Sequence, residues 1–343
     1  MLLRMPSYCR GFKCSAGDCS DSCCIGWEID IDDKTAEYYR SLNGSFGERL
    51  RASITFDDVY SFALKNERCP FLNERNLCDI ILTLGEDKLC HICAEHPRYY
   101  EWFSDIVEGG VGMCCEEAAR LILKNGHESG YYERKIPDES GDEYGDELYA
   151  MLFSAREKLQ ELLRDESFSL KAVVLAMLDF AEELQFSIDN YDYGVSLEIP
   201  ELKENACEKA DIAALLEIFC ELEPIDENWR PFITELKEKA PTFIDKKYEH
   251  YLRNIGIYFI WRYFMKGVFD EEILSKVKLS VISMAMLGLI FTAENADFER
   301  AVILSKDYSK ELEYSEENLE KIYDLTYTEN VFSSDSLKRF FNN

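Results

Sequence analysis

The amino-acid sequence predicts a mainly α-helical protein in which an irregular, cysteine-rich, metal-binding N-terminal region is followed by an all-helical array. Three observations support this fold class. Most cysteines lie within residues 1–115, the apolar residues after residue 147 recur at helical spacing, and an acidic segment with glycine and proline lies between these two parts. We therefore expect two domains, a cysteine-rich metal-cluster domain over residues 1–136 and a helical domain over residues 148–343.

The N-terminal part has few long apolar periods, so we expect loops, turns and short elements there. Residues 1–30 are predicted to form loop and turn around the first cysteines. A helix is expected over Thr35–Arg40, where Asp32 or Asp33 supplies the capping oxygen. The segment Cys69–Cys78 is predicted to form a tight hairpin that brings its two end cysteines together.

The crowding of cysteines requires a chemical explanation, since only Cys207 and Cys220 of the thirteen lie beyond residue 115. Disulfides are disfavoured, because Met1–Tyr8 lacks the features of a secretory signal and adjacent pairs such as Cys23–Cys24 suit a disulfide framework poorly. Thiols that pack as small apolar groups explain Cys207 and Cys220, which lie at apolar helix positions. The stretch Cys14–Cys24, rich in glycine, serine and aspartate, instead favours metal ligation by thiolates.

The spacing of the cysteines leaves the identity of the metal open. Structural zinc usually takes two C-x2-C knuckles, and only Cys90–Cys93 has that spacing. The run C-x4-C-x3-C-C in Cys14–Cys24 matches neither a zinc ribbon nor the C-x2-C-x2-C run of bacterial ferredoxins. Zinc and an iron–sulfur cluster are therefore both candidates.

The segment Pro137–Glu147 separates the two parts, because its glycine, proline and dense acid are typical of a linker. Beyond it the apolar residues follow the period of amphipathic helices, and we expect about seven to nine of these. The predicted helical segments are Leu148–Leu163, Leu170–Phe186, Ala206–Leu222, Trp229–Ala240, Tyr248–Met265, Asp270–Phe291, Asp297–Leu312 and a last one that begins after Ser315. The sequence contains no dinucleotide-binding, P-loop or kinase motif.

The net charge of −29 excludes some classes of partner. Nucleic acid and anionic lipid both require a basic surface, so we expect neither nucleic acid nor a membrane as partner. The longest uncharged run, Leu279–Ala293, is shorter than the ~18 residues of a membrane span and is expected to form a core helix. We therefore expect a cytoplasmic protein. Its acidity suits a cationic substrate, such as a lysine on another protein, or solubility alone.

Several short motifs resemble those of one known family. They are Phe12–Cys14 with Cys19, Asp21 and Cys23–Trp27; Cys69–Leu72 with Cys78; Leu84–Glu86 with Cys93 and Pro97–Arg98; Cys115–Leu121; and, in the helical part, Tyr251–Leu252, Tyr263–Lys266 and Tyr308–Asn318. Over nearly its whole length the sequence is similar to the flagellin lysine-N-methylase family. It departs from the family pattern at Glu116, where proline is usual, and at Lys310 and Tyr314, where arginine and histidine are usual. Residues 1–115 also resemble small cysteine-rich proteins that bind zinc or iron–sulfur clusters.

The resemblance implies a protein-lysine N-methyltransferase that uses S-adenosylmethionine, acts on flagellin and contains an iron–sulfur cluster. We expect a [4Fe–4S] cluster, with zinc as the alternative. Carried over motif by motif, the implied ligands are Cys14, Cys19, Cys23, Cys24, Cys69, Cys78, Cys93 and Cys115. This set exceeds the four thiolates that one cluster requires, so it has room for a second centre. Cys9, Cys90 and Cys114 fall outside the family pattern.

Methyl transfer to lysine sets its own chemical demands. The ε-amine attacks only when it is neutral, and its unperturbed pKa is ~10.4, so the site needs a base, a desolvating aromatic wall or both. The aromatic candidates are Tyr258, Trp261, Tyr263 and Tyr308, and the candidate bases are Glu311, Glu313 and Glu317. From these we select Tyr308, Glu311 and Glu317 as candidate catalytic residues. The competing interpretation is that the aromatic residues form core and the acids a solvated helix face. No spacing indicates where S-adenosylmethionine binds.

Two other functions compete with this one. The first is a noncatalytic helical scaffold that binds zinc or an iron–sulfur cluster and recognises a partner protein. The second is a radical enzyme, which is disfavoured because the C-x3-C pair Cys19 and Cys23 lacks the further C-x2-C spacing of the usual radical run. The sequence carries no signal for the oligomeric state.

Overall fold

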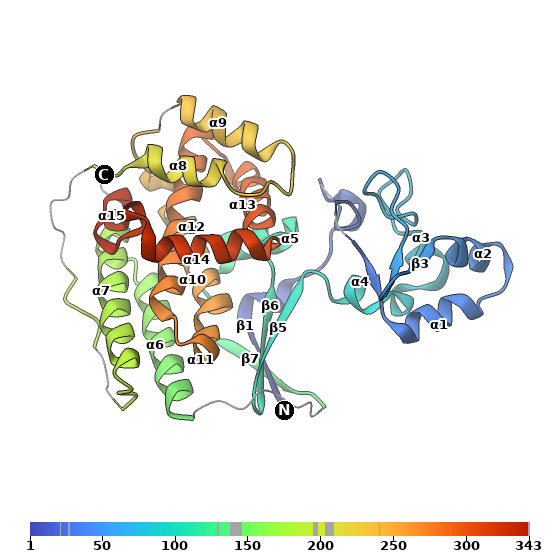
Figure 1. Ribbon diagram of the computed structural model, residues 1–343, viewed down its shortest axis with the longest axis horizontal. Coiled ribbons are helices and arrows are strands. Elements are labelled where there is room, and N and C mark those ends of the chain that lie inside the picture. Colours follow the sequence, from blue (N-terminus) through green and yellow to red (C-terminus); the bar gives the residue numbers. More distant parts are fainter. Residues whose placement is uncertain are drawn as a thin grey trace. The chain divides into compact units, whose positions relative to one another are not determined.

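The computed structural model describes residues 1–343 except for 21, 27, 129, 138–145, 195–197, 203–208, 240 and 342–343. The chain divides into two units, which are described separately below (Figure 1). The helical unit comprises Met1–Phe12, Tyr100–Cys114 and Ala118–Asn343, and the cysteine unit comprises Lys13–Tyr99 and Cys115–Glu117. The cysteine unit is thus an insertion in the chain of the helical unit.

This division differs from the two predicted domains, 1–136 and 148–343. The first residues of the chain and the segments around residues 100–114 and 118–136 join the helical unit, because they form or flank its sheet. Residues 138–145 of the predicted linker lie outside the described residues. A linker at 137–147 therefore stays a prediction.

A four-stranded sheet, in the order β5-β6-β1-β7, belongs to the helical unit. Its strands are β1 (Leu2–Pro6), β5 (Arg98–Phe103), β6 (Ile106–Val111) and β7 (Tyr131–Lys135). Strand β1 runs parallel to β6, with Leu3 opposite Val107, and antiparallel to β7. The prediction that residues 1–30 are only loop and turn was therefore wrong for β1, whose partners lie more than a hundred residues further along the chain.

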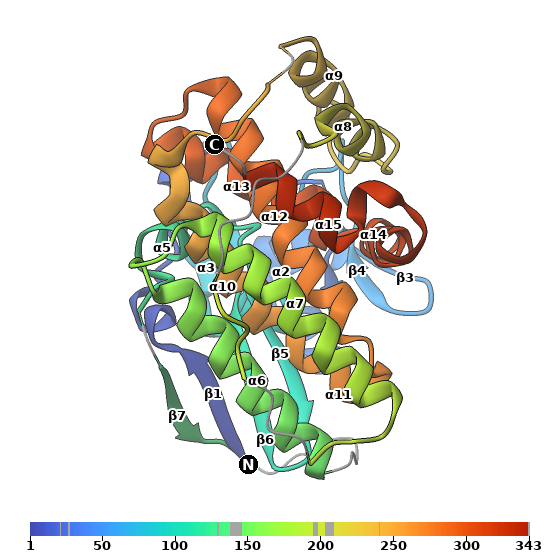
Figure 2. The ribbon, with the colours of Figure 1, turned by 90° about the vertical axis from the view of Figure 1, so that its left-hand side faces the viewer.

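Helices form the rest of this unit, which confirms the mainly α class and the helical array for the described residues. They are α5 (Glu116–Asn125), α6 (Asp146–Arg164), α7 (Leu170–Asp189), α8 (Ile212–Cys220), α9 (Trp229–Lys239), α10 (Glu249–Tyr263), α11 (Gly267–Asp270), α12 (Ile273–Glu294), α13 (Phe298–Glu313), α14 (Glu316–Thr328) and α15 (Ser334–Leu337). Helices α6 and α7 run side by side (Figure 2). Most element bounds differ from the predicted ones by a few residues, as expected where helix ends fray. The predicted helix Ala206–Leu222 corresponds to α8, and its first residues, with the predicted core thiol Cys207, lie outside the described residues.

Helix α12 is the centre of the helical unit, since it contacts α7, α10, α13 and α14. It has the length and apolarity of a membrane span, and 94% of its most apolar window is buried inside the fold. The core helix predicted around Leu279–Ala293 is therefore confirmed. Its close approach to α10 requires Gly256, where an added Cβ would lie 2.8 Å from the Met284 Sδ.

Buried polar contacts fix α6 and α10 to the sheet. Arg156 of α6 is fully buried and forms a two-bond ion pair with Glu108 of β6, and its Nη2 lies 2.7 Å from the Glu108 Oε1. The Trp261 indole of α10 donates to the Gly109 carbonyl at 3.0 Å. Removing either Arg156 or Glu108 would cost about 3–5 kcal/mol of folding free energy, because the other charge would be left buried without a partner. These contacts therefore stabilise the packing of α6 and α10 on the sheet.

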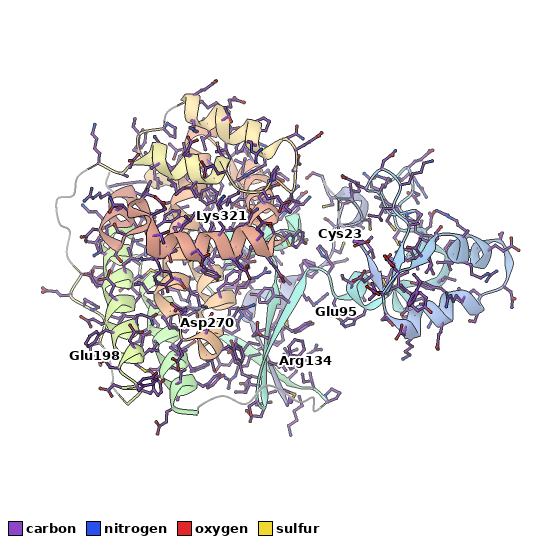
Figure 3. All side chains as sticks on the ribbon, in the orientation of Figure 1. Cys23, Glu95, Arg134, Glu198, Asp270 and Lys321 are labelled. Atoms are coloured by element: carbon purple, nitrogen blue, oxygen red, sulfur yellow. The ribbon has the colours of Figure 1, made fainter. Side chains whose placement is uncertain are left out.

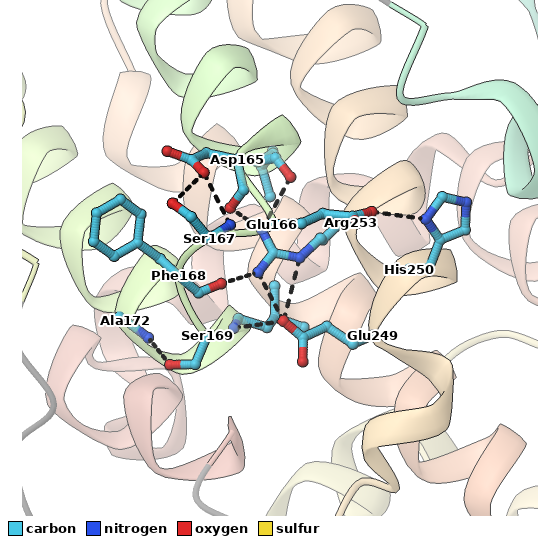
Figure 4. Close-up of polar contacts among 11 residues, drawn as sticks. Asp165, Glu166, Ser167, Phe168, Ser169, Ala172, Glu249, His250 and Arg253 are labelled. Carbon is cyan, nitrogen blue, oxygen red and sulfur yellow. Dashed lines mark hydrogen bonds and ion pairs between the residues drawn. The ribbon is translucent and has the colours of Figure 1, made fainter.

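The corner between α6 and α7 is held by Arg253 of α10 (Figure 4). Its guanidinium donates to the carbonyls of Leu163 and Asp165, both at 3.1 Å, and to that of Phe168. These carbonyls lie where α6 ends and has no further helical donors. The Glu249 carboxylate lies 2.7 Å from the Arg253 Nη2 and neutralises the charge of the guanidinium. It also accepts from the Leu170 amide, the first of α7.

The cysteine unit has a small core of its own, built from short elements. They are β2 (Asp30–Ile31), β3 (Ile54–Phe56), β4 (Tyr60–Phe62), α1 (Asp33–Ser41), α2 (Gly44–Ala52), α3 (Asp79–Leu84) and α4 (His91–Glu95), and the strands form a sheet in the order β2-β4-β3. Asp32 caps α1 by accepting from the Thr35 amide at 3.0 Å, as predicted. Tyr39, Phe62 and Phe71 pack together in the core.

Candidate functional site

Five cysteines lie in or against the core of the cysteine unit. Four of them come from the hairpin and from the start of α4, and we call these the inner thiols: Cys69, Cys78, Cys90 and Cys93. Cys69 and Cys78 come from the predicted hairpin, which is confirmed by the bridge between Leu72 and Cys78 and by the turn from Asn73 to Asn76. Cys69 and Cys90 are buried. Burial raises the pKa of the Cys69 thiol to about 12.

The other two inner thiols come from the start of α4. Cys90 is its capping residue and Cys93 lies in its first turn, and the two thiols hydrogen-bond to each other. That hydrogen bond lowers the pKa of Cys90 and raises the pKa of Cys93. Asp32 fixes the helix by accepting from the His91 amide at 2.9 Å. The C-x2-C spacing of Cys90 and Cys93 thus places both sulfurs at one position in the fold.

A second set, the outer thiols, comprises Cys14, Cys19, Cys23 and Cys115. Cys14 and Cys23 are exposed, and Cys23 is labelled in Figure 3. The hydrogen bond to Cys24 raises the pKa of Cys23, and Cys14 and Cys115 are among the neighbours that raise it further. The Glu116 carboxylate joins the segments, because it accepts from the Ser20 amide at 2.8 Å and from the Cys19 thiol at 3.7 Å.

Cys24 lies between the two sets. Its side chain packs against the core, and its carbonyl accepts from the Cys69 amide at 2.9 Å. The hydrogen bond to the neighbouring Cys23 thiol lowers the pKa of Cys24 to about 7. The two sets of thiols therefore meet at this adjacent pair.

All eight cysteines of the predicted ligand set belong to the cysteine unit, and thiolates are the donors that zinc and iron–sulfur clusters take. Metal binding by this set stays a prediction. Cys90, which lies outside the predicted set, is buried and hydrogen-bonds to Cys93 of that set. Cys9 and Cys114 belong to the helical unit. Across the ranges that the structure describes, no group of three or more His, Cys, Asp or Glu side chains is placed to hold a metal ion.

The three predicted catalytic residues make separate contacts in the helical unit. Tyr308 is fully buried and donates to the Ser283 hydroxyl at 3.0 Å, and burial raises its pKa. Glu311 is buried, and its carboxylate accepts from the amides of Ile225 and Asp226 at 2.8 and 2.6 Å. Glu317 is exposed in the first turn of α14. Catalysis by these residues stays a prediction.

The structure places a different carboxylate, Glu313, among the aromatic candidates. Its side chain is fully buried and accepts from the Tyr258 hydroxyl at 3.0 Å, the Tyr263 hydroxyl at 2.8 Å and the Ser309 hydroxyl. The Arg262 Nε lies 3.3 Å from it. We call these five residues the Glu313 cluster. Both the Tyr263–Lys266 and the Tyr308–Asn318 motifs contribute to it, and Tyr258, Tyr263 and Glu313 were among the aromatic candidates and candidate bases that the sequence offered.

The Glu313 cluster also holds the end of β6. The Tyr258 hydroxyl accepts from the Met113 amide at 3.0 Å and from Arg262 at 2.7 Å, while it donates to Glu313. Burial raises the pKa of Tyr263 well above its usual value, so this hydroxyl stays a donor. The Glu313 carboxylate is thus paired with three hydroxyl groups and one guanidinium. Through the hydrogen bond from the Met113 amide, the cluster also fixes the segment that precedes Cys114.

Comparisons with known proteins agree on one family. The FliB lysine N-methylase C-terminal domain matches residues 156–340, which is more than half of the chain. The lysine-N-methylase of Salmonella typhimurium is 27% identical over 192 residues, covering 51% of this chain and 45% of that protein. The flagellar biosynthetic protein FliU of Salmonella muenchen is 29% identical over 142 residues, covering 38% of this chain and 82% of that protein.

The chain matches less than half of the length of the lysine-N-methylase. No solved structure matches it. The family match spans the helices that carry the Glu313 cluster, Tyr308 and Glu311. On this match, the chain belongs to the FliB lysine N-methylase family.

Proposed function

We propose that the protein is a protein-lysine N-methyltransferase that transfers a methyl group from S-adenosylmethionine to lysines of flagellin in the cytoplasm. The observation that carries the proposal is the family match over residues 156–340. The printed names of two relatives, a lysine-N-methylase and a flagellar biosynthetic protein, support the reaction and the flagellar substrate. The net charge of −29 suits a substrate surface that displays lysines.

The chemistry requires a neutral acceptor amine. The lysine nitrogen forms a bond to the methyl carbon, the carbon–sulfur bond of the sulfonium breaks, and one proton leaves the nitrogen. Because the unperturbed lysine pKa is ~10.4, presenting the neutral amine at pH 7 costs about 5 kcal/mol, which a base or a desolvating wall must offset.

The described residues differ in how they could meet this demand. Glu317 is the one predicted base whose carboxylate is exposed and thus open to a substrate amine. Glu311 already accepts from two amides, and Tyr308 donates to Ser283. We therefore assign the proton-accepting role to Glu317 and the role of fixing the surrounding helices to Glu311 and Tyr308.

We further propose that the thiols of the cysteine unit hold a thiolate-bound metal, a [4Fe–4S] cluster or zinc. The inner and outer thiols supply the sulfur ligands that either group takes. A bound metal of this kind contributes folding free energy and fixes the short elements around it. The methyl transfer and the proton transfer described above involve only residues of the helical unit and the two substrates, and neither step requires the metal.

The test is methylation by the full-length protein, purified without oxygen and supplied with S-adenosylmethionine and flagellin from the same organism. We expect flagellin to gain mass in steps of one methyl group, on lysines only. Flagellin whose lysine amines are blocked is the matched control and should gain nothing. If unblocked flagellin also gains nothing and calorimetry detects no binding of S-adenosylmethionine, the noncatalytic metal-binding scaffold is the better interpretation.

A further inference from the structure

The C-terminal end of α7 and the turn after it carry the two most exposed large apolar side chains in the described part of the chain. Tyr191 is 76% exposed and Phe186 is 71% exposed. A single exposed aromatic residue is ordinary on a protein surface. Here two lie at the same helix end, and the half-buried Tyr193 follows them directly. The end of α7 therefore presents a patch of aromatic surface to solvent.

Two of these rings form a corner beside a carboxylate. The ring centroids of Tyr191 and Tyr193 lie 6.4 Å apart, and the ring planes meet at 79°. The Tyr193 hydroxyl donates to the Glu271 Oε1 at 3.0 Å. We call Tyr191, Tyr193 and Glu271 the aromatic corner. A cation is attracted to the face of an aromatic ring when it lies within ~6 Å of the centroid, so perpendicular rings beside a carboxylate suit a cation.

Hydrogen bonds from Gln185 of α7 hold the two sides of the aromatic corner together. Its side-chain nitrogen donates to the Glu271 carbonyl at 2.9 Å. Its side-chain oxygen accepts from the Ile273 amide at 2.8 Å. These bonds fix the turn between α11 and α12 to the last turns of α7. The aromatic corner is therefore built on the ends of packed helices, which position a binding site more precisely than a loop does.

The backbone at the aromatic corner is in a conformation that favours glycine. Tyr191 and Glu271 have φ values of 56° and 60°, in the left-handed region. At Tyr191 the turn is a usual helix ending, in which the Asp192 amide donates to the Ser187 carbonyl and the Tyr191 amide to the Ile188 carbonyl, both at 2.9 Å. Glycine is the common residue there because a side chain strains the backbone. Such strain is typical of binding sites, where the side chain has a task other than stability.

The segment around the rings is acidic. Asp189, Asp192 and Glu272 are exposed, and the sequence contains no lysine, arginine or histidine from residue 172 to residue 202. Lys276 of α12 is buried and pairs with Asp270, while its ammonium lies over the Tyr323 ring. The negative charge around the exposed rings therefore favours a cationic partner.

Hydration decides which cation fits such a site best. The ammonium of an unmodified lysine is strongly hydrated, and it loses hydrogen bonds to water when it moves against a ring. A trimethylated lysine keeps the positive charge but has no N–H group to desolvate, and aromatic sites recognise quaternary ammonium groups of this kind. Among the cations that a protein partner can offer, methylated lysine is the one that the aromatic corner favours.

We propose that the aromatic corner binds methylated lysine side chains of the protein that this enzyme modifies. The proposal rests on the proposed function, because methylated lysine is the product of that reaction. No covalent bond forms or breaks at the aromatic corner. Its task is to retain a partly methylated substrate while further lysines of the same substrate chain react.

The test uses three short glycine–serine peptides and calorimetry on the full-length protein. One peptide carries a central trimethyl-lysine, the second an unmodified lysine, and the third a neutral side chain of the same shape in which carbon replaces the charged nitrogen. We expect the trimethyl-lysine peptide to bind at least about fivefold more tightly than the other two, since each exposed ring contributes a factor of about 2–5.

Substitutions at one position separate binding from folding. Tyr191→Gly removes a ring and relieves the left-handed strain, so we expect it to lose the preference for trimethyl-lysine and to raise the melting temperature. Tyr191→Phe keeps the ring and should keep the preference. Phe243→Ala removes a different exposed ring of the helical unit, and this matched control should bind as the wild type does.

Three outcomes overturn the proposal. The first is a wild-type protein that gives no binding signal with the trimethyl-lysine peptide at millimolar concentration. The second is equal binding of the neutral peptide, which would show apolar contact alone. The third is unchanged binding by Tyr191→Gly, which would place the peptide elsewhere on the protein. Because the peptides are synthetic, a protein that fails to methylate flagellin leaves a positive result intact, and an active methylase that ignores these peptides refutes the proposal while the proposed function stands.

Discussion

Among single residues, Glu313 joins the side chains of two helices in the helical unit. Three hydroxyl groups and one guanidinium converge on its buried carboxylate, and they come from α10 and α13. A buried carboxylate is stable only with such compensation, since its desolvation costs several kcal/mol. We therefore expect the loss of any one of these donors to lower the free energy of unfolding by a measurable amount.

We expect Glu313→Gln to destabilise the helical unit by about 3–5 kcal/mol, because it leaves the Arg262 cation without its buried partner. Tyr258→Phe should cost about 1–3 kcal/mol, since it deprives the Met113 amide of its acceptor. Urea denaturation followed by circular dichroism measures both. Tyr327→Phe at the exposed end of α14 is the control, and an equal loss in all three variants would contradict the special status of this cluster.

Glu311 and Glu317 make a matched pair for a pH experiment. Burial, the largest cause, and the nearby Asp226 raise the pKa of Glu311, while its two amide donors and Lys310 oppose that rise. A carboxyl whose folded pKa is raised stabilises the fold at a pH below its unfolded pKa of ~4.3, and this stabilisation is lost as the pH rises through the folded pKa. Glu311→Gln should therefore weaken the decline of stability above pH ~4.3.

The same pair separates structure from catalysis. Glu317→Gln should keep the stability of the fold, because the Glu317 side chain is exposed, and it should reduce methylation by about 10²-fold or more, since a general base contributes about 10²–10⁴. Denaturation curves between pH 4 and 8 and initial rates of methylation give both quantities. An unaltered rate in Glu317→Gln would remove this residue from the catalytic assignment.

At the scale of elements, the sequence predicted the helices and the hairpin, because these depend on residues that are close together in the chain. The periods of apolar residues located the helices, and Asp32 capped α1 as expected. The hairpin at Cys69–Cys78 was predictable because its turn residues, such as Asn73, bond to their own neighbours. Strand β1 was not, since nothing in its own five residues indicates β6 and β7 as partners.

The candidate site divides in the same way. Eight thiols were selected from motifs, and the spacing of Cys90 and Cys93 is a local signal of the same kind; which of them bind a metal stays a prediction. The Glu313 cluster needs residues from α10 and α13 to meet, and that depends on how the helices pack. The selection of Tyr308 and Glu311 followed motif position alone, and neither motif nor period reveals that both side chains are buried with satisfied partners.

For the whole molecule, the sheet decides which fragments can fold. A fragment of residues 148–343 lacks all four strands, so Arg156 would lose Glu108 and Trp261 would lose the Gly109 carbonyl. We expect this fragment to be aggregated or molten. A chain in which residues 13–97 are replaced by a flexible linker keeps the four strands and should fold. Near-ultraviolet circular dichroism and thermal melting compare the two, and a cooperatively folding fragment 148–343 would contradict this expectation.

The parallel pairing of β1 with β6 also sets an order of events during synthesis. Strand β1 is translated before β6 and β7, and residues 13–99 of the cysteine unit lie between them in the chain. At ~5–20 residues per second, several seconds pass in which β1 has neither partner. Most of the inserted unit can therefore acquire its fold before the sheet of the helical unit is complete.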